Sequence, residues 1–406
     1  MMNFHQYINL VHSYIEEKRG SALSRMLTYQ DTEHATSEII MNEVNQNYIN
    51  SRINPNWSQI VFGHIHCCFL LFNGDYINAY KEQCNCVALL SKGLAVMKEE
   101  NWMAPVICLM ARDLRLLAIA ADIQNAHKNS GKSREGLYIP NEYLEKAAEP
   151  LMALFRAVCT DNRTSIDRTK RVAMMNLINQ LFKIYFRVNK LHLCRPLIRA
   201  LDSSTNMMDS FTKAQKVTYY YYLGMKNMFD SDYKTADELL SYSFANCHPK
   251  SLKNKRLILI FLIPVKMLLG VMPTQQLLEK YHLLPFAPIA RAVKQGNLSD
   301  LVNALETYSD FFWKFGIYLI LDKLKIIAYR NAFKKVCLIM KTHQVPIEAF
   351  RVILKFLRKE DVSIEEVNCI LANLIFEGKI KGYISLAHQK LVVSKQNPFP
   401  PLTQTS

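Results

Sequence analysis

The densest group of side chains that could do chemistry is a His and Cys cluster in the first quarter of the chain. It consists of His64, His66, Cys67, Cys68, Cys84 and Cys86. A structural zinc site needs four ligands that converge tetrahedrally, usually from C-x-x-C or H-x-x-x-H pairs, and neither spacing occurs in this cluster. Two positions apart on a helix, His64 and His66 would point in different directions. The cysteines lie within apolar helical patterns and are interpreted as buried free thiols. No metal and no other cofactor is predicted.

Catalytic motifs are also missing from the sequence. His64-x-His66 is the first part of a metalloprotease motif, but the positions where that motif needs Ser and Asp hold Gly74 and Ile77. The twelve glycines are scattered, and no phosphate-binding G-x-x-x-x-G-K-[ST], G-x-G-x-x-G or nucleophile-bearing G-x-S-x-G occurs. Because no nucleophile is placed beside a base, an enzyme is not expected.

The net charge of +15 is concentrated in two segments. Residues 163–199 hold nine Lys or Arg and one Asp, and residues 325–395 hold thirteen Lys or Arg and six acids. A basic surplus confined to two segments favours an anionic partner, either a nucleic acid or an acidic polypeptide. The alternative is a charge bias that only keeps the protein soluble.

Composition indicates a soluble helical protein. Half of the residues are apolar, Gly and Pro are few, and the longest apolar run, residues 257–265, is too short to cross a bilayer. The N-terminus is amphipathic and carries Glu16 and Glu17, so it does not resemble a signal peptide. An intracellular location without membrane contact and with reduced cysteines is therefore expected.

Residues 324–395 have the pattern of a winged helix. Pro346 is suited to the first position of a helix, and Ser363-x-x-Glu366 is a capping-box signal for the next. Gly378 is placed to end that helix. From Ile380 the apolar period changes from 3.6 to 2, and a turn then leads to the β-branched residues 391–393. The pattern predicts helices followed by a small antiparallel hairpin.

Cations accompany this predicted winged helix. Arg330, Lys334 and Lys335 lie on its first helix, with Ile326, Phe333, Val336 and Leu338 as the opposing apolar set, and Lys379, Lys381, Tyr383, Lys390 and Lys395 lie in or beside the hairpin. Lysines beside an exposed aromatic suit a nucleic-acid backbone and a stacked base, whereas lysines on an edge strand also prevent aggregation. The third helix carries Glu365, Glu366 and Glu377 and no Lys or Arg, so it is poorly suited to reading a major groove. Contacts to a strand's backbone are expected instead.

The rest of the chain is predicted to be a helical arm. Residues 4–27 fit one helix, residues 28–56 a long loop with one short helix, residues 127–136 a mobile loop, and residues 203–210 a break. A short polar turn between helices recurs with a small or apolar residue shortly after it, as listed here: residues 73–76 with Ala79, 189–191 with Cys194, 230–233 with Ala236 and 295–298 with Leu301. This indicates a degenerate tetratricopeptide-like stack, or chance recurrence in an all-α protein. The proline-containing tail is expected to be extended and to pack through Phe399.

The basic segment 163–199 contains one strongly amphipathic helix. A broad apolar stripe runs from Val172 to Phe186, and the cations beside it are Lys183, Arg187, Lys190, Arg195 and Arg199. Such a surface suits an acidic peptide or another helix. The alternative is a central helix of the stack with a solvated face.

A helical arm joined to a C-terminal winged helix resembles the PCI-domain family. The similarity covers most of the chain and is carried by residues 179–186, 190–194, 196–200, 253–256, 264–270, 325–331 and 392–401. It implies an N-terminal repeat arm over 1–210, the helical-repeat half of a PCI domain over 211–323, its winged-helix half over 324–396 and a Pro-rich tail over 397–406.

The resemblance also implies a function. It implies a non-enzymatic subunit of an mRNA export complex at nuclear pores, located in the nucleus, with an additional cytoplasmic location left open. The implied partners are a scaffold similar to germinal-centre-associated nuclear protein, a small acidic protein shared with the proteasome lid, and an RNA or DNA backbone. The alternative is a purely structural subunit of another PCI complex, of the proteasome lid or signalosome type, without nucleic-acid contact.

Overall fold

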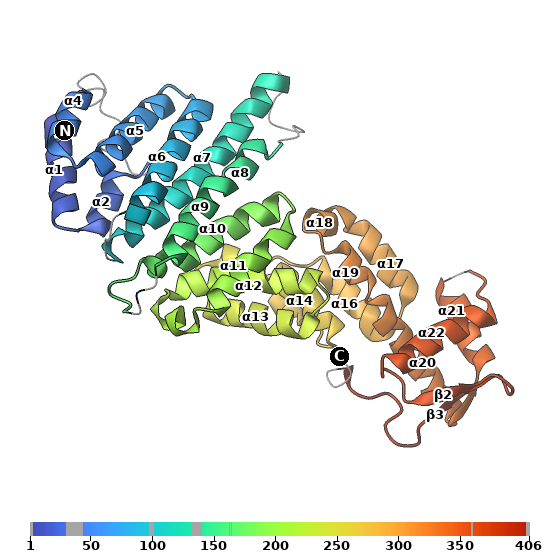
Figure 1. The fold of residues 1–406 in the computed structure, drawn as a ribbon. Helices are drawn as coiled ribbons and strands as arrows, with labels where there is room; N and C mark the ends of the chain where they lie inside the picture. Colours follow the sequence, from blue (N-terminus) through green and yellow to red (C-terminus); the bar gives the residue numbers. More distant parts are fainter. Residues whose placement is uncertain are drawn as a thin grey trace. The chain divides into compact units, whose positions relative to one another are not determined.

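The structure is a computed structural model that describes residues 3–29, 44–96, 101–130, 140–161, 163, 165–358 and 360–402. The chain forms two compact units, Met1–Tyr219 and Tyr220–Ser406 (Figure 1). Helices dominate both, and a small antiparallel sheet follows the helices near the C-terminus. The predicted fold class, a helical stack followed by a winged helix, is confirmed.

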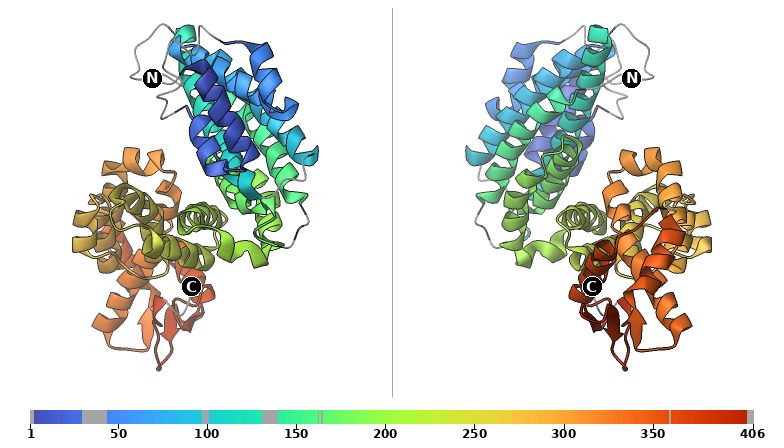
Figure 2. Two further views of the ribbon diagram at one scale, coloured as in Figure 1. Left: turned by 90° about the vertical axis from the view of Figure 1, so that its left-hand side faces the viewer. Right: turned by 90° about the vertical axis from the view of Figure 1, so that its right-hand side faces the viewer.

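The first unit is built from helices that run alongside one another, as both views of Figure 2 show. Its elements are α1 (Phe4–Glu16), α2 (Gly20–Met26), α4 (Gln46–Arg52), α5 (Pro55–Phe72), α6 (Tyr76–Val96), η1 (Asn101–Met103), α7 (Ala104–Ser130), α8 (Glu142–Lys146), α9 (Ala148–Cys159), η2 (Lys170–Ala173), α10 (Met174–Arg187), η3 (Leu191–Leu193), α11 (Cys194–Asp202) and η4 (Thr205–Ser210). Helix α12 (Lys213–Phe229) begins in this unit and ends in the second.

Residues 4–27 form two helices, so the prediction of one helix is wrong. The chain turns between α1 and α2, where Lys18 has a φ of 55°. Gly20 then lies so close to another segment that an added Cβ would be 1.6 Å from the Trp102 backbone oxygen. A tertiary contact sets this break, and the local helical periodicity does not reveal it.

The four predicted interhelical turns are confirmed. Each contains one residue with positive φ: Gly74, Asn189, Ser231 and Gly296. The residue predicted to lie at each helix crossing is fully buried in every case, and these residues are Ala79, Cys194, Ala236 and Leu301. Left-handed turns that lead into a buried small or apolar residue are the recurring unit of the stack.

The second unit continues the helices and then forms the sheet. Its elements after α12 are α13 (Tyr233–Asn246), α14 (Leu252–Leu268), α15 (Gln275–Lys280), α16 (Phe286–Gln295), α17 (Leu298–Thr307), α18 (Ser309–Lys314), α19 (Tyr318–Asp322), α20 (Lys325–Met340), β1 (Gln344–Pro346), α21 (Ile347–Arg358), α22 (Ile364–Phe376), β2 (Gly382–Ser385) and β3 (Lys390–Val393). The strands pair antiparallel in the order β1-β3-β2.

Strand β1 was not predicted. Pro346 ends this strand and α21 begins at Ile347, so the expectation that Pro346 opens the helix is corrected by one residue. Pro346 lacks an N–H, and β1 is an edge strand, where a proline is tolerated. Three residues are too few for alternation to show in the sequence.

The inner face of the sheet and the helices share one apolar core. Val345, Leu391 and Val393 are buried on that face. Among the helices, the rings of Phe333 and Phe350 pack edge to face with centroids 4.9 Å apart. Ser363 accepts a hydrogen bond from the Glu366 N–H at 3.1 Å, and Gly378 has the predicted left-handed φ of 70°. These features fix the winged helix as a compact body.

The remaining predictions for loops have mixed outcomes. In the segment 28–56, α4 is the short helix, and residues 30–43 lie outside the described residues. Helix α7 continues to Ser130, so it includes the first four residues of the loop predicted over 127–136, and residues 131–136 of that loop lie outside the described residues. The expected break at 203–210 contains the short 3₁₀ helix η4. The tail packs through Phe399, which is 8 % exposed, as predicted. The proposed four-part domain division stays a prediction.

Candidate nucleic-acid and partner interface

The outer face of the winged-helix sheet carries three of the predicted residues. Tyr383 pairs with Val392 and Ser385 pairs with Lys390, so Tyr383 and Lys390 are diagonal neighbours on one face. Tyr383 is 62 % exposed. Lys381 is exposed just before β2, and its carbonyl accepts from the Ser394 N–H at 2.8 Å, which extends the pairing by one residue. We call Lys381, Tyr383 and Lys390 the wing face. Its ring and ammonium groups can contact a base and phosphates, respectively.

Arg330 is not part of any exposed surface, which corrects its prediction as a nucleic-acid contact. It is 6 % exposed. Its guanidinium donates to the carbonyl oxygens of Phe399 at 3.2 Å and Pro400 at 2.7 Å, and it lies over the Phe399 ring. Burial lowers the pKa of Arg330. The helical pattern placed it with Lys334, but the C-terminal tail covers this part of α20.

Two further lysines of α20 are exposed. Lys335 donates to the Gln295 carbonyl at 2.8 Å, at the C-terminal end of α16, where a cation stabilises the helix. Lys334 is exposed one position earlier. Leu338, expected in the apolar core, is 65 % exposed instead. Lys334 therefore remains available for an anion, whereas Lys335 has a structural role.

Lys379 lies in a hollow at the base of the wing. Its ammonium pairs with Glu377, and its side chain is only 17 % exposed. The hollow, roughly 540 Å³, is also lined by Tyr233, Ile326 and Lys323. Lys323 donates to the Tyr233 hydroxyl at 2.9 Å. Lys379 was expected beside Tyr383 on the strand, but it precedes β2 and lines this hollow instead. Lys395 follows β3 and is exposed.

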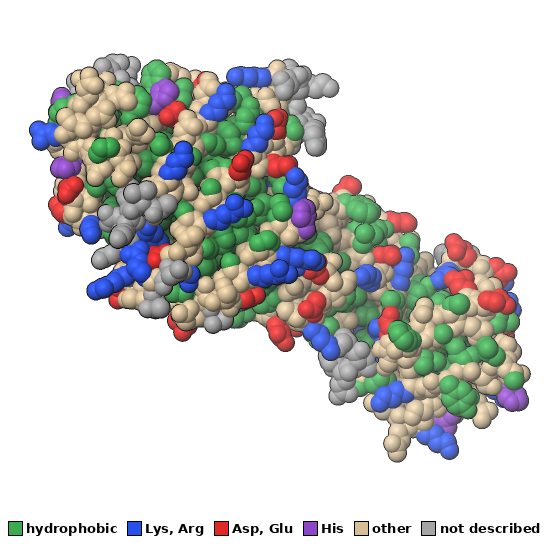
Figure 3. Space-filling view, in the orientation of Figure 1, with side chains coloured by type: hydrophobic (Ala, Val, Ile, Leu, Met, Phe, Trp, Pro, Cys, Tyr) green, Lys and Arg blue, Asp and Glu red, His purple; other side chains and the backbone are tan. Residues whose placement is uncertain are grey.

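The winged helix also exposes apolar side chains that the sequence assigned to no surface. They are Leu338, Ile339, Val352, Phe356, Phe376 and Leu386, with Phe376 91 % exposed. In Figure 3 apolar side chains form patches over the region where Figure 1 draws α20–α22 and β2, and Lys and Arg lie towards its edge. Helix α22 presents Glu365, and its Glu366 pairs with Arg358. This face suits contact with a protein better than entry into a DNA groove.

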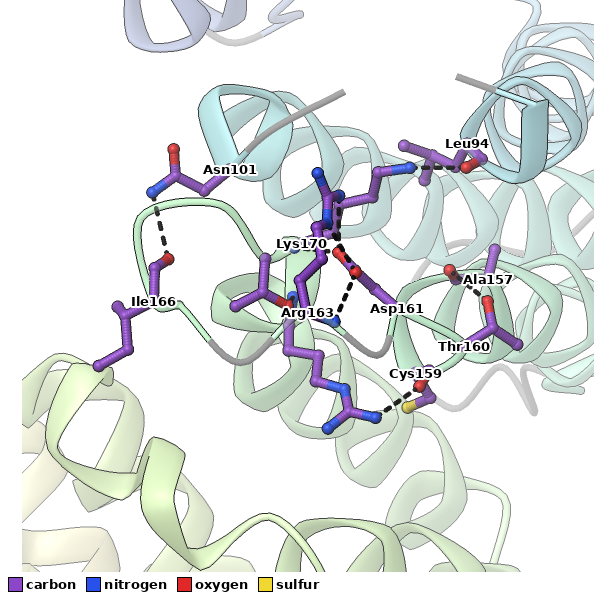
Figure 4. A network of polar contacts seen from close by, with 11 residues as sticks. Leu94, Asn101, Ala157, Cys159, Thr160, Asp161, Arg163, Ile166 and Lys170 are labelled. Carbon is purple, nitrogen blue, oxygen red and sulfur yellow. Dashed lines mark hydrogen bonds and ion pairs between the residues drawn. The ribbon is translucent and has the colours of Figure 1, made fainter. Parts of the chain in front are cut away.

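The first part of the basic segment 163–199 is used inside the first unit. Asp161 accepts from Arg163 at 2.8 Å and from the Lys170 N–H at 2.8 Å (Figure 4). Lys170 is buried, and its ammonium donates to the Leu94 carbonyl at 2.6 Å. Burial opposes the ionised form of Asp161, but the hydrogen bonds from Arg163 and Lys170 outweigh it and hold its pKa well below the usual range. These cations stabilise the fold.

The five predicted partner-binding cations of this segment divide into two groups. Lys183 is half-buried, and burial together with the nearby Arg115 lowers its pKa. Arg187 donates to the Asn141 side chain at 3.0 Å, and Lys190 pairs with Glu145. Arg195 and Arg199 are exposed, four residues apart on α11, and no partner is seen for either among the described residues. The structure therefore leaves α11 as the exposed cationic part.

The first unit also contains a groove close to the basic segment 163–199, since Lys190 and Leu193 of that segment help to line it. It encloses roughly 510 Å³ and is lined by Glu145, Met152, Arg156, Tyr185, Lys190 and Leu193, among others. Its walls come from α8, α9, α10 and η3. Apolar walls with charged groups at the edge are suited to a peptide. The sequence predicted the cations but not this concavity, because four separate helical elements have to pack together to form it.

Cys67, Cys68 and Cys86 of the cysteine cluster are buried as predicted, whereas Cys84 is only half-buried. Cys67 and Cys86 are buried, and burial raises the pKa of the Cys67 thiol to about 12. The Cys68 sulfur lies 3.6 Å from His64 Nε2. Within the described ranges, no three His, Cys, Asp or Glu side chains are grouped so that they could hold a metal ion. None of the helices described is both long enough and apolar enough to span a membrane.

Known proteins are similar to this chain in sequence over its whole length. Residues 305–395 match the model of the PCI domain. The chain is 49 % identical to PCI domain-containing protein 2 of Danio rerio over 100 % of this chain and 99 % of that protein. It is 47 % identical to PCI domain-containing protein 2 of Xenopus laevis, covering 99 % of this chain and 98 % of that one. Protein CSN12 homolog of Neurospora crassa is more distant, at 30 % identity over 80 % of this chain and 77 % of that protein.

None of these relatives is named as an enzyme. The match to the PCI domain covers the helices α18–α22 and the sheet. It therefore includes the wing face, which lies on that sheet. The similarity to the vertebrate proteins also includes the helical repeats of both units. The chain therefore belongs to the PCI domain-containing protein 2 family of PCI-domain scaffold proteins.

Proposed function

We propose that this chain is a non-enzymatic binding subunit of an mRNA export complex that couples transcription to nuclear export at nuclear pores. In this role the helical repeats dock a PCI-like scaffold similar to germinal-centre-associated nuclear protein and a small acidic protein. The winged helix contributes cations that hold RNA or DNA by its backbone. Full-length similarity to PCI domain-containing protein 2 is the observation that carries the proposal.

The wing face supports the nucleic-acid part of the proposal. Lys381, Tyr383 and Lys390 are on one face of a sheet whose other face is buried. Lysine contacts to phosphates do not depend on base sequence, and their affinity falls steeply with salt because counterions are released. Lys334 and Lys395 are exposed in the same unit and complete the proposed set. Binding should therefore be indifferent to sequence.

The exposed arginines of α11 support the acidic-protein part. Arg195 and Arg199 are four residues apart and so project from one side of the helix. Together with the groove that Lys190 and Leu193 line, they offer cations beside apolar walls. Crosslinks from the acidic protein should reach α10, α11 or this groove. Crosslinks confined to other helices would remove this assignment.

A second candidate function is a purely structural PCI subunit of the signalosome or proteasome lid type. The exposed apolar side chains of the winged helix favour it, because Phe356 and Phe376 are typical of a surface that a protein covers. The similarity to Protein CSN12 homolog points in the same direction. In this role the winged helix would contact a partner's domain and no nucleic acid.

Purification of the tagged chain from cell extract, followed by mass spectrometry, separates the two functions. The export proposal predicts co-purification of a PCI-like scaffold and a small acidic protein together with pore proteins. Stoichiometric recovery of lid or signalosome subunits without that scaffold would refute it. A chain that carries Phe356→Asp and Phe376→Asp sharpens the comparison. The structural candidate predicts that this variant loses the co-purified subunits, whereas the export proposal, which docks the scaffold through the helical repeats, predicts that the scaffold is still recovered.

A further inference from the structure

The backbone of Lys381, a wing-face residue, is held by the segment of chain that follows the sheet. The Lys381 carbonyl accepts from the Ser394 N–H at 2.8 Å, and the Lys381 N–H donates to the Pro398 carbonyl at 2.9 Å. Strand β2 begins only at Gly382, so these two bonds fix the backbone of Lys381 where the strand has not yet begun. The position of this lysine therefore depends on where the C-terminal tail lies.

A tight reversal of the chain brings the tail back to Lys381. The Ser394 side chain donates to the Gln396 carbonyl at 2.8 Å and accepts from the Gln396 N–H at 3.2 Å. Asn397 follows with a φ of 48°, a left-handed conformation that Asn adopts more readily than most residues. The reversal also carries the exposed Lys395, so the tail acts on a second lysine of the proposed nucleic-acid set.

Beyond the reversal the tail is anchored at two places in the same unit. Phe399 is buried, and Arg330 Nη2 donates to the Phe399 and Pro400 carbonyls at 3.2 and 2.7 Å. Leu402 lies against Gly270, whose φ of 90° and missing Cβ permit the close contact. In Figure 1 the tail accordingly runs from the sheet back towards the helices of its own unit.

The composition of the tail suits docking and not direct contact with a polyanion. Residues 397–402 contain three prolines and no charged side chain. Proline restricts the backbone before docking, so less conformational entropy is lost when the tail is held in place. Proline also lacks an N–H, so the tail presents mainly carbonyl acceptors that need a donor. An effect of the tail on a nucleic acid must therefore act through the residues that the tail holds.

Arg330 supplies that donor in a form that fixes geometry. Its side chain is buried, and its Nε has no hydrogen-bond partner among the described residues. A buried charge loses its hydration, and well-packed apolar residues often stabilise a fold as well as a buried ion does. The planar guanidinium, however, donates in fixed directions and so determines where both carbonyls lie. This arrangement indicates a positioning role for Arg330.

We propose that residues 397–402 are a strap that positions Lys381 for a nucleic-acid phosphate, and that Arg330 is the positioning residue that holds the strap. This inference rests on the proposed function, which assigns the nucleic acid to the wing face. Tyr383 and Lys390 lie within the paired strands and keep their positions when the strap is released. Lys381 then loses the acceptor of its N–H, and its phosphate contact is lost.

The first test measures binding of a labelled single-stranded oligouridine to the reconstituted complex by fluorescence anisotropy. Arg330→Met keeps the apolar stem and removes the donors, and it should weaken binding about fivefold, which corresponds to about 1 kcal/mol. The slope of log affinity against log salt should become shallower by about 0.7, the value for one phosphate on a single strand. Arg291→Met, at an exposed arginine of α16, removes the same charge and should leave both quantities unchanged.

A double-variant cycle separates positioning from a general loss of stability. In a chain that already carries Lys381→Ala, Arg330→Met should have no further effect on affinity, because the contact that the strap positions is absent. An equal loss of affinity with and without Lys381 would overturn the proposal.

Hydrogen exchange of the full chain tests the strap without any nucleic acid. Arg330→Met should speed the exchange of peptides that contain the Lys381 and Ser394 amides and leave that of α22 unchanged. Uniform acceleration throughout the winged helix would show a loss of stability alone and would also overturn the proposal. An unchanged chain that binds no oligouridine would refute the proposed function, while the exchange measurement would still decide whether the strap holds Lys381. If Arg330→Met does not fold, Leu402→Ala loosens the other anchor and is read in the same way.

Discussion

Arg330 joins the C-terminal tail to the winged helix, and its removal should destabilise the second unit. The guanidinium donates to the carbonyls of Phe399 and Pro400, and the Lys381 N–H donates to the Pro398 carbonyl at 2.9 Å. Farther along the tail, Leu402 contacts Gly270, where an added Cβ would be 2.4 Å from the leucine Cβ. The tail thus connects α20, the wing and the end of α14 within one unit.

The size of the effect follows from these contacts. A hydrogen bond that involves a charged donor contributes about 1.5–3 kcal/mol, and a buried carbonyl left without a donor costs about 1–3 kcal/mol. Burial of the guanidinium offsets part of the gain, since it lowers the pKa of Arg330 and its Nε is buried without a partner among the described residues. We therefore expect Arg330→Ala to lower the free energy of unfolding by about 3 kcal/mol.

Urea denaturation of the full chain measures this change, with the unfolding transition of the second unit as the readout. Deletion of residues 397–406 should cost more, because it also removes the Lys381–Pro398 hydrogen bond and the contact of Leu402 with Gly270. The double variant should cost little more than the deletion alone, because the deletion already removes the carbonyls to which Arg330 donates. Lys334→Ala, four residues along the same helix and exposed, is the control and should change stability by less than about 0.5 kcal/mol. Full additivity of Arg330→Ala and the deletion would refute the interpretation.

Three further predictions concern the first unit. The lowered pKa of Asp161 means that its ionised form contributes stability above about pH 4, and that this contribution disappears as the pH falls through the lowered pKa. Asp161→Asn should therefore reduce the free energy of unfolding by about 2 kcal/mol near pH 7, with a difference that shrinks in acid, as urea titrations at several pH values will show. Gly20→Ala should cost about 2–3 kcal/mol, since its Cβ would meet the Trp102 carbonyl. Gly74→Ala should cost only about 1 kcal/mol. No atom lies within 4 Å of its added Cβ, so the strain of a φ of 71° is the sole penalty. Equal melting points for the Gly20→Ala and Gly74→Ala variants would contradict this comparison.

Local signals in the sequence were sufficient for the turns of the helical stack. Asn189 and Ser231 adopt left-handed backbone conformations where the polar turn pattern placed them, and the crossing residues Cys194 and Ala236 are buried. The capping pattern at Ser363 and the helix end at Gly378 depend only on neighbours in the chain. Such features could be predicted because each requires only a few consecutive residues.

The sequence could not predict which cations are free. Arg330 and Lys334 share a helical face by spacing, yet the tail buries the first and leaves the second exposed. Lys170 contributed to a basic segment in the sequence, but its ammonium is bonded to a carbonyl contributed by α6. Periodicity predicts on which side of a helix a residue lies. The partner of a charged side chain, however, depends on segments distant in the chain.

The most direct test of the central claim is the salt dependence of RNA binding by the reconstituted complex of this chain and the proposed scaffold. The variant K381E/K390E should bind single-stranded RNA more weakly, and the slope of log affinity against log salt should become shallower by about 0.7 for each phosphate that the variant no longer neutralises. Tyr383→Ala should lower affinity with no change of slope, because stacking releases no counterions. The pair K92E/K213E, which reverses two exposed lysines of the first unit, is the matched control. An RNA affinity and slope that K381E/K390E leaves unchanged, in a complex that still assembles, would contradict the account.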